Sequence, residues 1–169
     1  MVLRDECDSM TKLSSQQVAE YFSRSYKAVD GLWFMKVEDK HGFDAALELD
    51  NDVWKVMPKI QARMFKSFLG VENGSDALFE SLVTKLELEG FKFKAEMTEN
   101  GFRITITDCP WHNLMIKSGR EHLSKKVGKT ICSTEYQVWA SEFEETIKFK
   151  LKSQKCSESE HCILDFVSQ

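Results

Sequence analysis

Two kinds of segment are missing from this sequence: long apolar runs and flexible linkers. No apolar stretch approaches the roughly 18 residues that a membrane-spanning helix needs, and the N-terminal residues 1–7 contain no apolar signal core. Only 2 Pro and 8 Gly occur in 169 residues, so no Pro-rich or Gly-rich linker divides the chain. We therefore expect a cytoplasmic protein with a flexible N-terminus at residues 1–13 and a single α+β domain at residues 14–169.

An excess of basic residues is also missing. The formal charge is −4 and the pI is about 5.6, whereas nucleic-acid-binding domains are usually basic. We expect no direct contact with nucleic acid and none with a membrane. The partners that remain are a small-molecule ligand, a second copy of the chain in a homodimer, or another protein.

The first half of the chain is predicted to be helical. Ser14 and Gln17 form a capping box, and apolar residues at helical spacing follow it as far as Val37. Asp50 is expected to cap a later helix, and Pro58 inside that helix predicts a kink or a break. The predicted helices after the first one cover residues 43–47, 50–69 and 75–89.

The second half switches to the alternation of apolar and polar residues that is typical of strands. The dipeptide Asn100-Gly101 between the first two runs is a strong signal for a hairpin. Strands are predicted at 91–97, 102–107, 147–152 and 162–167, and helices from Pro110 and at 133–143. The fold class is therefore α+β: a helical N-terminal half, then a four-stranded antiparallel sheet of two β-hairpins separated by helices, with helices covering one face.

Four of the five cysteines fall at the edges of predicted elements in the C-terminal half. Thiols stay reduced in the cytosol, so they indicate metal binding, redox chemistry, catalysis or packing before they indicate disulfides. Four thiolates can bind zinc or an iron–sulfur cluster, but the wide spacing equally suits small buried side chains. His112 or His161 could replace one thiolate ligand. The candidate metal ligands are Cys109, Cys132, Cys156 and Cys162.

Cys109 also supports a catalytic hypothesis. A thiol at a helix N-terminus has its thiolate favoured by the helix dipole, and His112, one turn later, could serve as the base. The alternatives are a packed cysteine at the helix cap and a redox switch in which the thiols form reversible disulfides. The sequence leaves open whether the protein is an enzyme.

Polar residues interrupt the apolar stripes of two predicted helices. Asp30 lies on the first stripe and Gln61 on the third, and buried polar groups need partners. They could bond each other or Arg63 structurally, or form the polar points of an aromatic ligand pocket. The candidate ligand-binding residues are Asp30, Trp33, Gln61 and Arg63, in a pocket bordered by Trp33, Trp54 and Phe65.

Two C-terminal segments resemble the 4-vinyl-reductase domain, which is related to heme–NO-binding folds and serves as the sensor module of phenol-responsive activators. These segments are residues 128–136 and 156–166. The resemblance implies a zinc site that uses Cys132, Cys156 and Cys162 with an upstream histidine. No upstream histidine aligns here, and Cys109 takes the place of the fourth ligand.

Three further segments, at residues 25–33, 56–63 and 109–111, resemble a group of small cytosolic proteins from anaerobic bacteria and archaea. A sister group carries the label L-2-amino-thiazoline-4-carboxylate hydrolase. The leading hypothesis is a metal-binding, small-molecule-binding domain with a sensor-like or cofactor-handling role. The rival hypothesis is a hydrolase or thiol enzyme that uses Cys109 or a metal-bound water.

Overall fold

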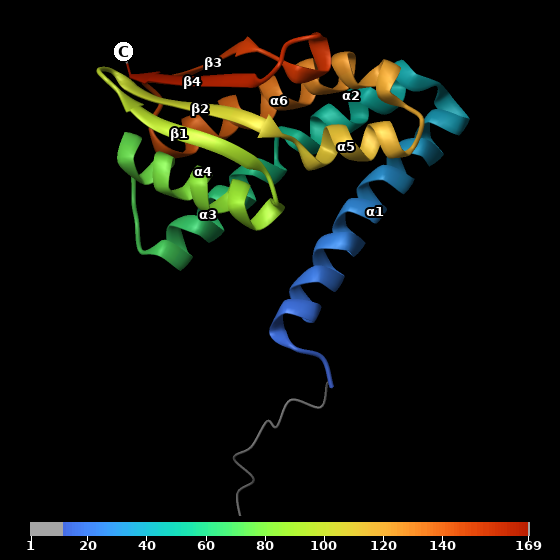
Figure 1. Ribbon diagram of the computed structural model, residues 1–169, viewed down its shortest axis with the longest axis horizontal. Coiled ribbons are helices and arrows are strands. Elements are labelled where there is room, and N and C mark those ends of the chain that lie inside the picture. The colour runs from blue at the N-terminus through green and yellow to red at the C-terminus, as the bar shows by residue number, and fades with distance from the viewer. Residues whose placement is uncertain (1–11, 169) are drawn as a thin grey trace, which may run out of the picture.

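A computed structural model describes residues 12–168 and confirms the α+β class (Figure 1). Residues 1–11, which include Cys7 and most of the predicted flexible N-terminus, lie outside the described residues, as does Gln169. The elements in chain order are α1 (Ser15–His41), α2 (Phe43–Trp54), α3 (Met57–Leu69), α4 (Ser75–Glu89), β1 (Lys92–Thr98), β2 (Gly101–Asp108), α5 (Pro110–Lys117), α6 (Glu121–Phe143), β3 (Ile147–Ser153), the 3₁₀ turn η1 (Lys155–Ser157) and β4 (Cys162–Ser168).

The helical boundaries agree with the sequence signals at the start of α1 and differ around Asp50. The predicted capping box is present, with the Ser14 hydroxyl accepting from the Gln17 backbone N–H. Asp50, however, lies inside α2 and caps nothing, so that prediction was wrong. The chain breaks after Trp54 instead, and Pro58 lies in the first turn of α3, where a missing N–H costs no helical hydrogen bond.

Helix α6 is longer than the sequence predicts. It runs without interruption from Glu121 to Phe143, whereas the pattern predicted a helix that starts after Cys132. A single glycine inside a helix, here Gly128, costs only about 1 kcal/mol, which tertiary packing readily outweighs. Cys132 therefore lies within the helix, while Cys109 is the N-cap residue of α5, as expected.

The sheet is entirely antiparallel, with strand order β1-β2-β4-β3. The hairpin β1–β2 turns at the predicted Asn100-Gly101. Gly101 is required there, because its φ is 147° and a Cβ atom would lie 2.0 Å from the Phe166 carbonyl oxygen. In the register, Phe93, Ile106 and Cys162 are neighbours on one face. Cys162 thus shares the face of Leu164 and Phe166, as the alternation predicts.

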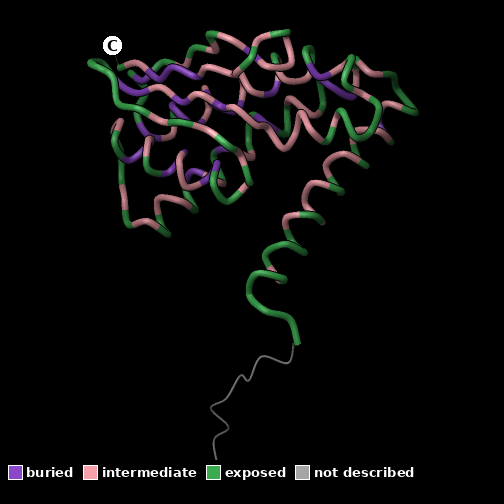
Figure 2. The backbone as a smooth tube through the Cα atoms, viewed as in Figure 1, coloured by how far each residue is buried: buried purple, intermediate pink, exposed green. Residues whose placement is uncertain are grey.

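Helices α4 and α6 cover the inner face of the sheet and form the main core with it (Figures 1 and 2). Helix α1 packs mainly against α2, and its N-terminal half extends away from the body of the molecule. Within residues 12–168, no helix has the length and apolarity to span a membrane. The largest fully buried core side chains include Leu78, Leu82 and Leu86 of α4, Trp139 and Phe143 of α6, and Phe102, Ile104, Leu164 and Phe166 of the sheet.

Candidate functional site

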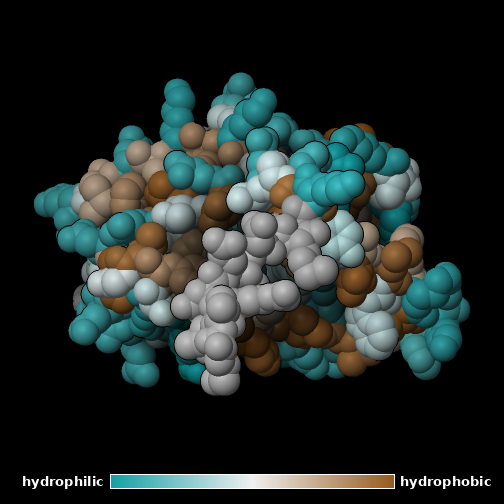
Figure 3. All heavy atoms as spheres, turned by 90° about the horizontal axis from the view of Figure 1, so that it is seen from below, coloured by the Kyte–Doolittle hydropathy of each residue, from teal (hydrophilic) through white to brown (hydrophobic). Residues whose placement is uncertain are grey.

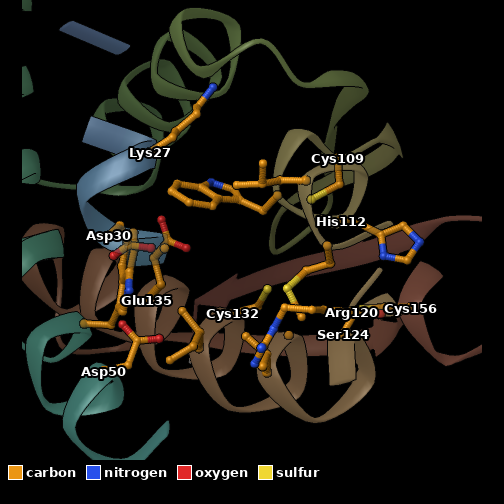
Figure 4. Close-up of a pocket in the computed structure, with 18 of the residues that line it drawn as sticks. Lys27, Asp30, Asp50, Cys109, His112, Arg120, Ser124, Cys132, Glu135 and Cys156 are labelled. Atoms are coloured by element: carbon orange, nitrogen blue, oxygen red, sulfur yellow. The ribbon is translucent and has the colours of Figure 1, made fainter. Parts of the chain in front are cut away.

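A cavity of about 340 Å³ lies between the helices and one end of the sheet. Its walls come from α1, α2, α5, α6, η1 and the inner face of the strands, so nearly every part of the fold contributes. Its polar groups gather at two ends. Figure 4 shows Asp30, Asp50 and Glu135 on one side and Cys109 and Cys156 on the other. We call these the acid end (Asp30, Asp50 and Glu135) and the thiol end (Cys109, Cys132, Cys156 and Cys162).

The thiol end brings together all four cysteines that the sequence singles out. They come from the cap of α5, the middle of α6, η1 and the first residue of β4, and all four are free thiols lining the cavity. Gly128 leaves room for this arrangement. A Cβ atom there would lie 2.9 Å from the Cys156 sulfur and 2.5 Å from Nε2 of Gln154. Four cysteines from separate elements of the chain thus lie at one end of the same cavity.

Burial keeps these thiols protonated. It raises the pKa of Cys109 to about 11, and the backbone N–H groups of His112 and Trp111 oppose this rise only in part. Burial likewise raises the pKa of Cys156 to about 11, with Cys162 adding to the rise, and it raises the pKa of Cys132 well above its ordinary value. At neutral pH the site therefore holds thiols and few thiolates.

The catalytic pair predicted from the sequence is not assembled. His112 and Cys109 both line the cavity, but within residues 12–168 the Cys109 thiol is hydrogen-bonded by the backbone of His112 and not by its imidazole. Nδ1 of His112 is buried without a hydrogen-bond partner among these residues. A thiol with a raised pKa and no bonded base is a poor nucleophile at neutral pH, although His112 remains close enough to the cavity to meet a ligand.

The side chains of the thiol end are of a kind that binds metals, but their present positions are not those of a metal site. Cys₄ sets bind zinc and iron–sulfur clusters, and the Cys162 sulfur already accepts a hydrogen bond of 3.2 Å from the Lys155 backbone N–H. Among the described residues, however, no group of three or more His, Cys, Asp or Glu side chains is placed to hold a metal ion. Of the two histidines proposed as substitutes, His112 lines the cavity and His161 does not.

Burial raises the pKa values of all three carboxyl groups at the acid end. Burial raises the pKa of Asp50 to about 7, Asp30 adds to the rise, and a hydrogen bond from Trp54 opposes it. Burial also raises the pKa of Asp30. Within residues 12–168, the Asp30 carboxylate has neither a hydrogen bond nor an ion pair, so its hydrogen-bonding capacity is open to the cavity.

Aromatic rings form the wall beside the acid end. Trp111 of α5 lies between Tyr26 of α1 and Trp54 of α2, with edge-to-face contacts at 6.0 and 6.3 Å between ring centroids. Trp54 and Trp111 both line the cavity. The apolar rings of this wall suit an apolar group, and their electron-rich faces suit a cation.

A buried lysine supports the acid end from behind. Nζ of Lys85 on α4 lies 2.8 Å from a carboxylate oxygen of Glu89 and 2.8 Å from one of Glu135 on α6. Burial alone would lower the pKa of Lys85, but Glu135 and Glu89 together outweigh burial and raise it. Sequence reasoning missed this group, although Lys85 interrupts the apolar stripe of its helix in the same way that Asp30 interrupts the first.

The cavity differs from the pocket predicted from the helical stripes. Asp30 and Trp54 line it, as predicted, whereas Trp33, Gln61, Arg63 and Phe65 are not among its lining residues. Trp33 is 62% exposed, and Phe65 packs on Trp139 in the core. Arg63 pairs with Glu142, and the buried Gln61 Oε1 has no partner among residues 12–168. Of the three predicted borders, Trp54 lines the cavity and Trp33 and Phe65 do not, and Trp111 of α5 contacts Trp54 in the cavity wall instead.

Comparison with known proteins places this arrangement in a family. Residues 9–167 match the family described as "Family of unknown function (DUF6125)". The chain belongs to the DUF6125 family. The match covers the described fold up to the next-to-last residue of β4, so the cavity with its acid and thiol ends lies wholly inside the DUF6125 region. No curated protein and no solved structure matches the chain.

Proposed function

We propose that this DUF6125 protein is a cytoplasmic small-molecule-binding domain with a sensor-like or cofactor-handling role. The observation that carries the proposal is the unpartnered Asp30 carboxylate at one end of a cavity walled by aromatic and aliphatic side chains. A volume of about 340 Å³ falls in the range of small-molecule sites. Four free thiols support a reducing compartment.

The chemistry of the acid end favours a ligand with a protonated amine and an apolar body. The negative charge of Asp30 raises the pKa of Asp50, and a cation between the two carboxylates would remove that repulsion. The rings of Trp54 and Trp111 line the same cavity as these carboxylates and would contact the apolar body. A neutral or anionic ligand of the same shape would leave Asp30 desolvated and unpaired, which costs binding energy.

The test compares three probes that share one body and differ in their head group: phenethylamine, 2-phenylethanol and phenylacetate. Binding measured by calorimetry and by the shift in melting temperature should follow the order amine, alcohol, acid. Asp30→Asn should remove the preference for the amine. Asp52→Asn serves as the matched control, because Asp52 lies on the solvent side of α2 and pairs with Lys55. Equal binding of amine and acid would refute this ligand class.

A Cys-ligated metal, zinc or an iron–sulfur cluster, is the second candidate function. The observation in its favour is the gathering of Cys109, Cys132, Cys156 and Cys162 at one end of the cavity. The N–H···S hydrogen bond from Lys155 to Cys162 is of the kind that supports thiolate ligands. Binding would require the sulfur atoms to move together and lose their protons. Such a centre would link α5, α6, η1 and β4.

Metal analysis and an absorption spectrum of protein purified without oxygen or chelator test this candidate. Zinc would be colourless and an iron–sulfur cluster brown. Cys132→Ser and Cys162→Ser should release the metal and lower the melting temperature, whereas Cys7→Ser, outside the described residues, should change neither. Less than about a tenth of an equivalent of any transition metal in the wild-type protein would exclude this function.

A further inference from the structure

Helix α1 is apolar on two sides, and one of them packs against the body of the protein while the other stays largely exposed among residues 12–168. Toward the body, Tyr26 contacts Trp111, Phe34 contacts Phe43, and Val37 is buried. Val37 is the one buried residue of the 27 in this helix. On the other side, large apolar side chains remain 54% to 67% exposed: Tyr21, Phe22, Val29, Leu32 and Trp33. Leu32, at the edge of this set, also lines the cavity. We call these five residues the α1 stripe.

The α1 stripe has the spacing of a helix-packing seam. Val18, Phe22, Ser25, Val29 and Leu32 follow one another at alternating steps of four and three residues, the repeat that places apolar residues along one side of a pair of helices. Tyr21 and Trp33 flank this seam. The partner that the spacing favours is therefore another helix, rather than a sheet edge or an extended peptide.

The exposed area is large for one side of a single helix. From the exposed fractions, the α1 stripe leaves on the order of 600 Å² uncovered among residues 12–168, at the upper end of the roughly 300–600 Å² of the largest apolar patch on a typical monomer, and such patches often mark interaction sites. Two copies of the stripe would bury on the order of 1,200 Å², which exceeds the roughly 1,000 Å² expected of a specific interface. Further hydrophobic side chains are visible on the face from which α1 extends (Figure 3).

We infer that the α1 stripe is the interface with a second copy of this chain, in which the two α1 helices pack antiparallel about a two-fold axis. A two-fold contact requires a surface that complements itself. With the axis near the centre of the stripe, Phe22 faces Leu32 of the second copy, Tyr21 faces Trp33, and the small Ser25 faces Val29. Large and small side chains then alternate across the seam, as in packed helix pairs.

The charge of α1 argues against a membrane surface as the occupant. Interfacial membrane helices are rich in Lys and Arg on their polar side. Helix α1 instead carries four basic residues (Arg24, Lys27, Lys36 and Lys40) and four acidic residues (Glu20, Asp30, Glu38 and Asp39), so its side-chain charge is zero. A surface of anionic lipid would therefore attract α1 only weakly, whereas the packing of two apolar stripes requires no attraction between charges.

Sedimentation equilibrium over about a hundredfold range of protein concentration tests the dimer. The wild-type protein should have twice the 19.5 kDa mass of one chain and dissociate on dilution. Phe22→Glu and Val29→Glu would each bury carboxylates in the seam and should raise the dissociation constant at least about 100-fold. Both positions are exposed in the single chain and do not line the cavity, so each variant should keep its helical circular dichroism and its ligand binding.

Leu88→Glu is the matched control. Leu88 on α4 is 72% exposed and lies outside the stripe, so its variant should remain a dimer. A wild-type protein that stays monomeric at the highest concentration, or a dimer that Val29→Glu leaves intact, would overturn the inference. So would co-sedimentation of a monomer with vesicles of anionic phospholipid, which would assign the α1 stripe to a membrane.

Discussion

Replacing Lys85 by Met should be the most destabilising single change at the acid end of the cavity. The Lys85 side chain is 3% exposed, and its Nζ lies 2.8 Å from both Glu89 and Glu135. Met preserves the length and apolar stem of the side chain but removes the charge. Two carboxylates then remain in a region from which water is largely excluded, with side-chain exposures of 17% and 10%.

The size of the loss of stability depends on which of the two carboxylates can turn toward solvent. Removing one partner of a buried ion pair costs about 3–5 kcal/mol, because the other charge stays buried. Glu89 lies in the last turn of α4 and can turn toward solvent, whereas Glu135 is held within α6. We therefore expect a loss of about 3 kcal/mol, mostly from Glu135. The double variant Lys85→Met/Glu135→Gln should recover about 1–2 kcal/mol, since a neutral amide is cheaper to bury.

The loss should depend on pH. Burial raises the pKa of Glu135, and Lys85 opposes this rise, so removing Lys85 raises the pKa further. A carboxyl group whose pKa is higher in the folded state contributes stability that is lost as pH rises above the ordinary value of about 4.3. The variant should therefore be destabilised less at about pH 5 than at about pH 8.

Urea unfolding followed by tryptophan fluorescence at these two pH values measures both effects. Lys36→Met is the control, because Lys36 and Asp39 form an ion pair that is 71% and 63% exposed. Exposed pairs of this kind contribute about 0–1 kcal/mol. If Lys85→Met cost no more than Lys36→Met, or cost the same at both pH values, the account of a buried charge triad would be refuted.

Three further predictions concern the cavity. Because the pKa of Asp50 is raised to about 7, the stability that it contributes at low pH should be lost as pH rises from about 4 to about 7, and Asp50→Asn should remove this part of the pH dependence of the melting temperature. Gly128→Ala should destabilise the protein by about 1–2 kcal/mol, because its Cβ would press on Gln154 and Cys156. Gly31→Ala, which meets nothing within 4 Å, should instead stabilise α1 by about 0.5–1 kcal/mol, as thermal unfolding would show. Alkylation of Cys109 by iodoacetamide should accelerate up to about pH 11, whereas a plateau near neutral pH would favour a thiol enzyme.

Features that depend on a few neighbouring residues could be predicted from the sequence. The Ser14 capping box, the hairpin at Asn100-Gly101 and the inward side of Cys162 were all confirmed. Each rests on local hydrogen bonds, on a glycine conformation or on the two-residue period of a strand, and these act whatever the rest of the chain does. The α+β class followed from the same local signals.

Local patterns failed where a distant segment decided the outcome. The pattern placed a helix start after Cys132, but packing against α2, α3 and β3 keeps α6 continuous through Gly128. The ion pair of Lys85 with Glu135 joins residues 50 positions apart, and the sequence of neither helix indicates that it packs against the other. Even so, a charged residue on an apolar stripe was a usable signal, because it singled out Asp30, which lines the cavity.

The sequence by itself determined that α1 has apolar residues around much of its circumference, because side-chain identity and helical period require no partner. Only the tertiary structure decided that Asp30 faces the cavity and Tyr26 contacts Trp111, while Trp33 faces outward. The physical reason is that periodicity shows which residues share a side of a helix but not what covers that side. The same holds for the four cysteines: their number and types are local facts, whereas their meeting at one end of a cavity depends on how α5, α6, η1 and β4 pack together.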